Sequence, residues 1–161
     1  MCSHLIMFTV ALANIPRGCV APLVDALYQG YNGTVLAYGQ VLVFIANGSE
    51  EMETISIIDV LRRAKAEVID ASVEDAKETI GSRKVKIVAD MLLNEASKLS
   101  YDLIALPGGI PGAKKFTSSE TLVEMLKKQK FSKKSCGAIC ASPALVLEPH
   151  GLLEYGLFSG G

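Results

Sequence analysis

The sequence predicts an α/β protein built on a doubly wound, mostly parallel sheet with helices on both faces. Short apolar runs alternate with segments of helical periodicity from residue 41 onward. The first run, VLVFIA at residues 41–46, is apolar throughout, as expected of a strand covered on both faces. Repeated strand–helix units of this length favour a parallel sheet that binds ligands at the carboxyl ends of its strands.

The first 40 residues stand outside this alternation. Residues 5–13 (LIMFTVALA) are apolar and residues 11–13 imitate a signal cleavage site, but residues 1–4 contain no Lys or Arg. Secretion is therefore not expected, and the run is too short to span a bilayer. Residues 19–30 then predict a short helix and residues 34–38 a strand.

From residue 47 to residue 99 the pattern predicts two strand–helix units and a projecting arm. A helix opens with acidic residues and ends with Arg62 and Arg63, which complements its dipole. In chain order, the predicted elements are a turn at 47–49, a helix at 50–64, a strand at 67–72, a polar connection at 73–79, an edge strand or hairpin arm at 84–88 and a short helix within 89–99.

The remaining residues predict two buried strands, each followed by a loop of small residues. A strand at 102–106 leads into the loop PGGIPG at 107–112, and cap residues at 117–120 precede a helix at 122–130. A last strand at 136–139 ends at Cys140. Pro143, in the first turn of an Ala/Leu/Val segment, predicts that a helix follows.

Cys140 is the candidate nucleophile. A thiol on a tight turn between a strand and a helix faces the unpaired N–H groups of the helix, which favour the thiolate. The alternative is a small buried core residue, because free cysteine is among the most often buried residue types.

Two other loops should meet Cys140 at the same edge of the sheet. In the acidic loop, helical spacing puts Glu50 and Glu53 on one face and turns Glu51 away. One of that pair could reach the site, and the other acids would be caps or solvated charges. In the glycine loop, the N–H groups of Gly108 and Gly109 could meet an anion, although a plain turn explains the same residues.

Composition excludes several classes of function. Sixteen Lys and Arg against seventeen Asp and Glu give a net charge of −1, so no nucleic-acid surface and no membrane attachment is expected. The lysine pairs at 127–128 and 133–134 fit a solvated helix face and loop. No metal is expected, and a reduced cytoplasmic setting fits better than a disulfide scaffold, because none of the four cysteines shows zinc-ligand or CxxC spacing: Cys2, Cys19, Cys136 and Cys140.

Three motifs together carry a resemblance to the ThiJ/PfpI superfamily over residues 41–152. They are GSEEMET at 48–54, LPGGIPGA at 106–113 and AICASP at 138–143, in the order and spacing of that family. The wording SPALVLEPHG at 142–151 is most like the plant members of its eukaryotic glyoxalase and deglycase branch. The resemblance implies a flavodoxin-like fold, and the chain at 41–161 would be a C-terminally truncated version of that domain.

The resemblance also implies a site and a reaction. Cys140 would be the nucleophilic and oxidisable thiol, Glu53 the carboxyl group hydrogen-bonded to it, and Gly109 and Ala141 the N–H donors to an oxyanion, beside Gly108. Members are described as cofactor-free glyoxalases or protein deglycases acting on methylglyoxal and glyoxal, and as homodimers. A peptidase is not expected, since peptidases of the superfamily place His after the nucleophile, where this chain has Ala141.

Residues 18–40 resemble the kinesin motor segment that leads into the phosphate-binding loop of that family. No Gly-Lys pair occurs anywhere in the chain, so the phosphate-gripping lysine is absent and motor ATPase activity is not expected. The sequence therefore leaves three alternatives open: an enzyme acting on small carbonyls, a redox sensor or stress chaperone that responds through Cys140, or an inactive truncated chimera. Residues 1–40 would be a segment foreign to the family in each case.

Overall fold

The computed structural model describes residues 39–63 and 66–153. The predictions for the apolar run at 5–13, the helix at 19–30 and the strand at 34–38 lie outside the described residues. So do almost all of the kinesin-like segment at 18–40 and the last eight residues, 154–161.

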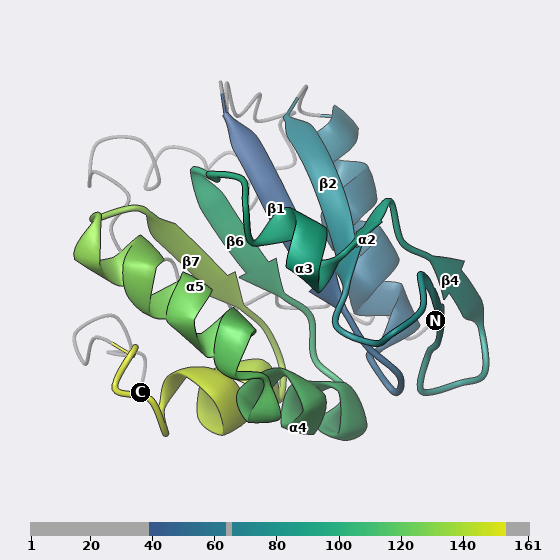
Figure 1. The fold of residues 1–161 in the computed structure, drawn as a ribbon. Coiled ribbons are helices and arrows are strands. Elements are labelled where there is room, and N and C mark those ends of the chain that lie inside the picture. Colours follow the sequence, from purple (N-terminus) through teal and green to yellow (C-terminus); the bar gives the residue numbers. More distant parts are fainter. Residues whose placement is uncertain (1–38, 64–65, 154–161) are drawn as a thin grey trace, which may run out of the picture.

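A five-stranded parallel sheet forms the centre of the described chain, in the order β5-β2-β1-β6-β7 (Figure 1). In chain order its strands are β1 (Gln40–Ile45), β2 (Glu67–Ser72), β5 (Met91–Leu92), β6 (Leu103–Leu106) and β7 (Ser135–Ala138). The predicted doubly wound, parallel α/β fold is confirmed.

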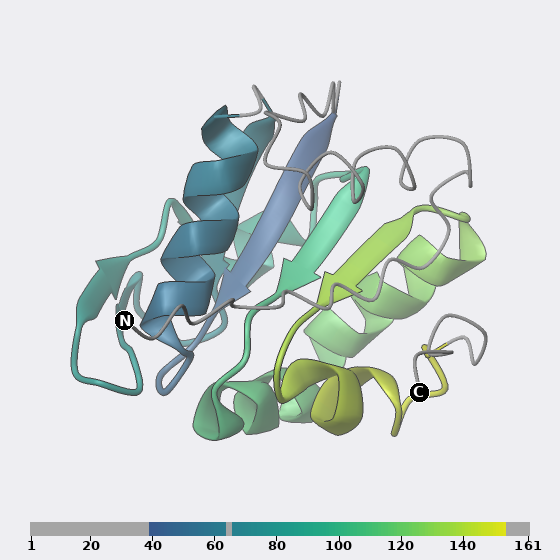
Figure 2. The ribbon, with the colours of Figure 1, turned by 180° about the vertical axis from the view of Figure 1, so that it is seen from behind.

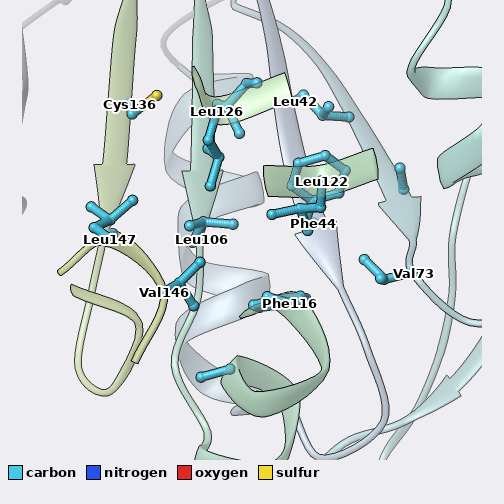
Figure 3. Close-up of a cluster of buried hydrophobic side chains, with 14 of the residues drawn as sticks. Leu42, Phe44, Val73, Leu106, Phe116, Leu122, Leu126, Cys136, Val146 and Leu147 are labelled. Carbon is cyan, nitrogen blue, oxygen red and sulfur yellow. The ribbon is translucent and has the colours of Figure 1, made fainter. Parts of the chain in front are cut away.

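Helices cover both faces of this sheet. α2 (Glu51–Arg63) lies against one face, and α3 (Leu93–Ala96) and α5 (Glu120–Phe131) lie against the other (Figures 1 and 2). Successive residues of β1 divide between the two layers. Val41 and Val43 join the apolar cluster under α2, whereas Leu42 and Phe44 join the larger cluster under α5, part of which Figure 3 shows. Complete burial on both sides explains why β1 is apolar throughout.

A hairpin stands beside α2, as one of the two alternatives for residues 84–88 predicted. β3 (Glu78–Ile80) pairs with β4 (Lys86–Val88) in the antiparallel sense. Glu51 of α2 fastens its tip, since the carboxylate accepts hydrogen bonds from Ser82 Oγ at 2.7 Å and the Arg83 N–H at 2.6 Å. The expectation that Glu51 would be a cap or a solvated charge is therefore wrong, because only 7% of this residue is exposed.

Three local predictions need correction. Residues 89–99 contain the edge strand β5 as well as a helix, and two strand residues give no periodicity to detect. The loop predicted at 107–112 turns into α4 (Ile110–Ser118), which begins with Pro111 in its first turn, where no backbone N–H is needed. The helix after Cys140 is a single π-type turn, η1 (Pro143–Leu147), closed by the Glu148 N–H donating to Pro143 O at 2.9 Å.

Candidate active site

Cys140 lies on a strained turn at the carboxyl end of β7. Its φ is 58°, in the left-handed region, which costs a residue with a side chain about 1 to 2 kcal/mol. Two hydrogen bonds from Ser142 hold the turn: its N–H donates to Ile139 O at 3.1 Å and its Oγ donates to Pro107 O at 2.6 Å. The exposed thiol is thereby presented at the sheet edge where ligands of doubly wound proteins bind.

Ser142 holds the cysteine turn in place, although the sequence predicted no role for it. It is fully buried, and its hydroxyl joins the cysteine turn to the glycine loop after β6. The signal in the sequence was a hydroxyl among small apolar residues, since a buried hydroxyl needs a hydrogen-bond partner elsewhere in the fold.

The single turn of η1 changes the predicted electrostatics of the thiol. The sequence predicted a helix whose dipole would favour the thiolate. A turn of five residues aligns few peptide dipoles, so this contribution is small.

Glu53, rather than Glu50, is the carboxylate that reaches the turn. Glu50 caps α2, since its Oε2 accepts from the Glu53 N–H at 3.0 Å and its carbonyl from the Thr54 N–H at 3.0 Å. Glu53 is half-buried, and its Oε2 accepts a hydrogen bond from the Gly108 N–H at 2.7 Å. Because Glu50 is engaged in capping the helix, Glu53 is the acid of this pair that reaches the turn.

Gly108 separates Glu53 from Cys140, and only a glycine fits there. A Cβ placed on Gly108 would lie 2.6 Å from both Glu53 Oε2 and Cys140 Cβ, and 3.0 Å from Cys140 Sγ. Real Cβ atoms do not approach other atoms so closely. The carboxylate and the thiol therefore flank one point in space, with a bare α-carbon between them.

Two backbone N–H groups in the glycine loop and the cysteine turn have no acceptor within the described ranges: those of Gly109 and Ala141. The Gly108 N–H, by contrast, is already engaged by Glu53. Gly109 has φ +90°, and a Cβ there would lie 2.7 Å from Glu50 N and would also meet Gly48 O. Contact with the acidic loop thus fixes the glycine loop, and oxyanion binding by Gly109 and Ala141 stays a prediction.

Neither a metal-ligand cluster nor a membrane-spanning helix is found within the described ranges. Residues 39–63 and 66–153 contain no group of three His, Cys, Asp or Glu side chains that could hold a metal ion. Over the same ranges, no helix has the length and apolarity that crossing a bilayer requires. Cys136 lies apart from the turn, and its burial raises the pKa of its thiol to about 12.

The strained turn places this chain among doubly wound α/β proteins that carry a candidate nucleophile at the carboxyl edge of the sheet. Residues 39–158 match the DJ-1/PfpI family, most of the chain, and the protein belongs to that family. The predicted resemblance is thereby confirmed. The kinesin-like segment is not addressed by this match.

Relatives from plants are the most similar among those found. The chain is 66% identical over 115 residues to "Protein DJ-1 homolog B" of Arabidopsis thaliana and 56% identical over 115 residues to its homolog A, with 71% of this chain covered in each case. It spans only 26% and 29% of the length of those two proteins. A Caenorhabditis elegans relative, "Glutathione-independent glyoxalase DJR-1.2", is 38% identical over 65% of this chain and 55% of its own length.

Solved structures agree with the fold. Oxidised DJ-1 of Toxoplasma gondii superimposes with a TM-score of 0.70 at 52% identity, and the match covers 71% of this chain and 62% of that one. Drosophila melanogaster DJ-1beta superimposes with a TM-score of 0.68 at 35% identity, over 70% of this chain and 60% of that one. The chain therefore spans less than two thirds of these structures.

Proposed function

We propose that this protein is a cofactor-independent glyoxalase or protein deglycase that acts on methylglyoxal, glyoxal or their adducts through Cys140. The observation that carries the proposal is the flanking of Gly108 by the Cys140 thiol and the Glu53 carboxylate. A nucleophile and a proton carrier on either side of a bare α-carbon suit addition to a small aldehyde. The worm relative named as a glyoxalase supports the same reaction class.

The reaction begins at the thiol. Cys140 Sγ attacks the aldehyde carbon of methylglyoxal and forms a C–S bond, while the carbonyl oxygen takes the electron pair. The free N–H groups of Gly109 and Ala141 are the donors available to that oxygen.

Glu53 then moves a proton between the two carbons of the substrate. It removes the hydrogen from the former aldehyde carbon and returns a proton to the neighbouring carbon, while the proton lost by the thiol ends on the former ketone oxygen. The first carbon thereby becomes a thioester and the second an alcohol. Water cleaves the C–S bond, releases lactate and restores the thiol. The aldehyde is oxidised and the ketone reduced within one molecule, so no outside oxidant or reductant is needed.

The purified chain tests this proposal directly. Incubated with methylglyoxal and without glutathione, it is expected to produce lactate stoichiometrically with the aldehyde consumed. A chain with a cooperative thermal transition that produces no lactate contradicts the proposal.

A second candidate function is redox sensing or stress-linked chaperone activity through Cys140. The contrast between an exposed Cys140 and a buried Cys136 favours selective oxidation of the first. The Toxoplasma relative has been solved in a form named as oxidised. Peptide mapping after mild peroxide treatment would distinguish this candidate, which requires a sulfinic acid on Cys140 and a reduced Cys136.

We further propose a cytoplasmic homodimer. Exposed apolar side chains on α2 and the hairpin support self-association, namely Met52 at 63%, Ile55 at 48% and Val85 at 49% exposure. Glu51 holds the hairpin tip against α2, so the two elements that carry these side chains lie next to each other. Light scattering on the purified chain measures the mass, and a monomer at all concentrations contradicts this proposal.

A further inference from the structure

The C-terminal end of α5 carries the most exposed large apolar side chain among the described residues. Phe131 closes the helix and is 92% exposed, compared with 67% for Val88, the next in order. The ring stands at a protruding point of the surface. A side chain in a groove or pocket would be shielded by its walls, so Phe131 is not part of a concave site.

Five lysines surround this phenylalanine in the sequence, and no acidic residue lies among them: Lys127, Lys128, Lys130, Lys133 and Lys134. We call this segment, residues 127–134, the lysine tip. Lysines in the last turn also stabilise a helix through its dipole, but that role explains neither the pair beyond the helix nor the exposed ring.

Ion pairs within the described chain neutralise only two of these charges. Lys127 Nζ lies 3.1 Å from Glu124 Oε1, and Lys134 Nζ lies 3.6 Å from Asp102 Oδ1. Lys130 donates to the neutral carbonyl of Gly151 at 2.8 Å. The lysine tip therefore presents about three uncompensated positive charges around an exposed aromatic ring.

We propose that the lysine tip docks the protein on an anionic phospholipid surface. Each lysine near such a surface gains about fivefold in binding, and an apolar ring that enters the headgroup region supplies the second signal that stable attachment needs. A protruding ring suits a soft, flat surface. An acidic peptide or a single-stranded nucleic acid would need a groove to follow, and a convex tip offers none.

The position of the lysine tip leaves the candidate active site free. α5 runs back along the sheet and ends near the amino end of β7, whereas η1 and the cysteine turn follow the carboxyl end of β7 (Figure 1). A membrane-bound molecule would therefore hold Cys140 away from the lipid. The proposal does not depend on the proposed reaction, and lactate production should be the same with and without vesicles.

Sedimentation with large vesicles tests the proposal on the full chain at about 0.1 M salt. Binding is expected to phosphatidylcholine vesicles that contain about 30% phosphatidylserine, and not to pure phosphatidylcholine. Phe131→Ala should weaken binding about tenfold, and the double variant Lys128→Glu with Lys133→Glu by about 25-fold or more. Raising the salt to about 0.5 M should release the protein.

Matched variants elsewhere on the surface provide the control. Val88→Ala removes another exposed apolar side chain, and Lys114→Glu reverses an exposed charge on α4 at the opposite edge. Both should bind the anionic vesicles like the unmodified chain. Absence of binding to anionic vesicles, equal binding to neutral ones, or equal losses in the control variants would each overturn the proposal. Binding of an acidic peptide or RNA through the lysine tip without vesicle binding would overturn it in favour of that partner.

Discussion

Cys136 and Cys140 lie four residues apart and carry the same thiol group, but the structure buries the first and exposes the second. Cys136 lies inside β7 within the larger apolar cluster, is 7% exposed and has a pKa raised to about 12 by burial (Figure 3). Cys140 is exposed on a left-handed turn beside Glu53 and Gly108. The path of the backbone over four residues, rather than the residue type, decides which thiol can react.

Replacing each cysteine in turn is the strongest test of this contrast. Cys140→Ala should abolish lactate production from methylglyoxal, because it removes the only nucleophile in the proposed site. Cys136→Ala should keep the activity and lower the free energy of unfolding by about 1 kcal/mol through the small cavity it leaves. Lactate assays and urea titrations measure the two effects. Activity retained in Cys140→Ala would remove the thiol from the mechanism.

The carboxylates of α2 offer a second test, in which the expected loss of lactate production is smaller. Glu53→Gln keeps an oxygen that can accept from the Gly108 N–H but cannot carry a proton. Lactate production should fall by about 10²- to 10⁴-fold, the usual contribution of a general acid or base. The thermal midpoint should change little, because the hydrogen bond to the glycine loop is retained. Near-normal turnover in this variant would assign proton transfer to another group.

Glu51→Gln is the matched control, since Glu51 acts on the fold and not on the site. Burial raises the pKa of Glu51, but hydrogen bonds from its own N–H, Ser82, Arg83 and Val85 outweigh it and lower the pKa to about 2. The ionised group therefore stabilises the protein above pH about 4.5, and this stability is lost as the pH falls toward 2. The variant should melt earlier at pH 7, respond less to acid in that range, and keep its turnover while folded.

Gly108→Ala asks whether the close approach of Cys140 and Glu53 matters. The added methyl would lie 2.6 Å from both side chains, so one of them must move. A displacement of about 1 Å should lower turnover about 10²-fold. Gly151→Ala is the control, because a Cβ there meets nothing within 4 Å and strains only the backbone at φ +64°. Equal turnover in the two variants would contradict the geometry proposed for the site.

The sequence predicted most of the sheet because its strands carry strong local patterns. β1 and β6 are apolar runs that lead into turns of small residues, and α2 and α5 have charged ends that suit their dipoles. β5 was missed because a strand of two residues has no period. Its place in the sheet is set by pairing with β2, a contact 20 residues away in the sequence.

At the site, the sequence could place three loops at one edge but could not choose between their side chains. Helical spacing allowed Glu50 or Glu53, and only the capping bond from the Glu53 N–H to Glu50 Oε2 decides between them. The hydrogen bond from Ser142 to Pro107 joins residues 35 apart in the sequence, so no local pattern predicts it. Spacing predicts which residues share a face, whereas packing between elements decides which of them touch.

A third pair of like side chains, Asp70 and Asp90, extends the contrast to acids away from the site. The side chain of Asp70 is 7% exposed and that of Asp90 is 48% exposed, and Arg62 Nη2 contacts them at 3.2 Å and 3.1 Å. Burial, together with the hydrogen bond and charge of Asp90, raises the pKa of Asp70 from 3.8 to about 6. The pKa of Asp90 is lowered, because hydrogen bonds to Asp70 and the charge of Arg62 outweigh its own burial.

Asp70→Asn should therefore change stability with a definite pH dependence. Because the folded-state pKa is raised, the contribution of Asp70 is fully present below pH about 4 and is lost as the pH rises through about 6. Between pH 4 and pH 7, the free energy of unfolding of the variant should rise by about 2 kcal/mol relative to that of the unmodified chain, measured by urea titration. Asp59→Asn, which loses an exposed pair with Arg63, should change stability by less than about 1 kcal/mol at either pH. Parallel curves for Asp70→Asn and the unmodified chain would contradict the raised pKa of Asp70.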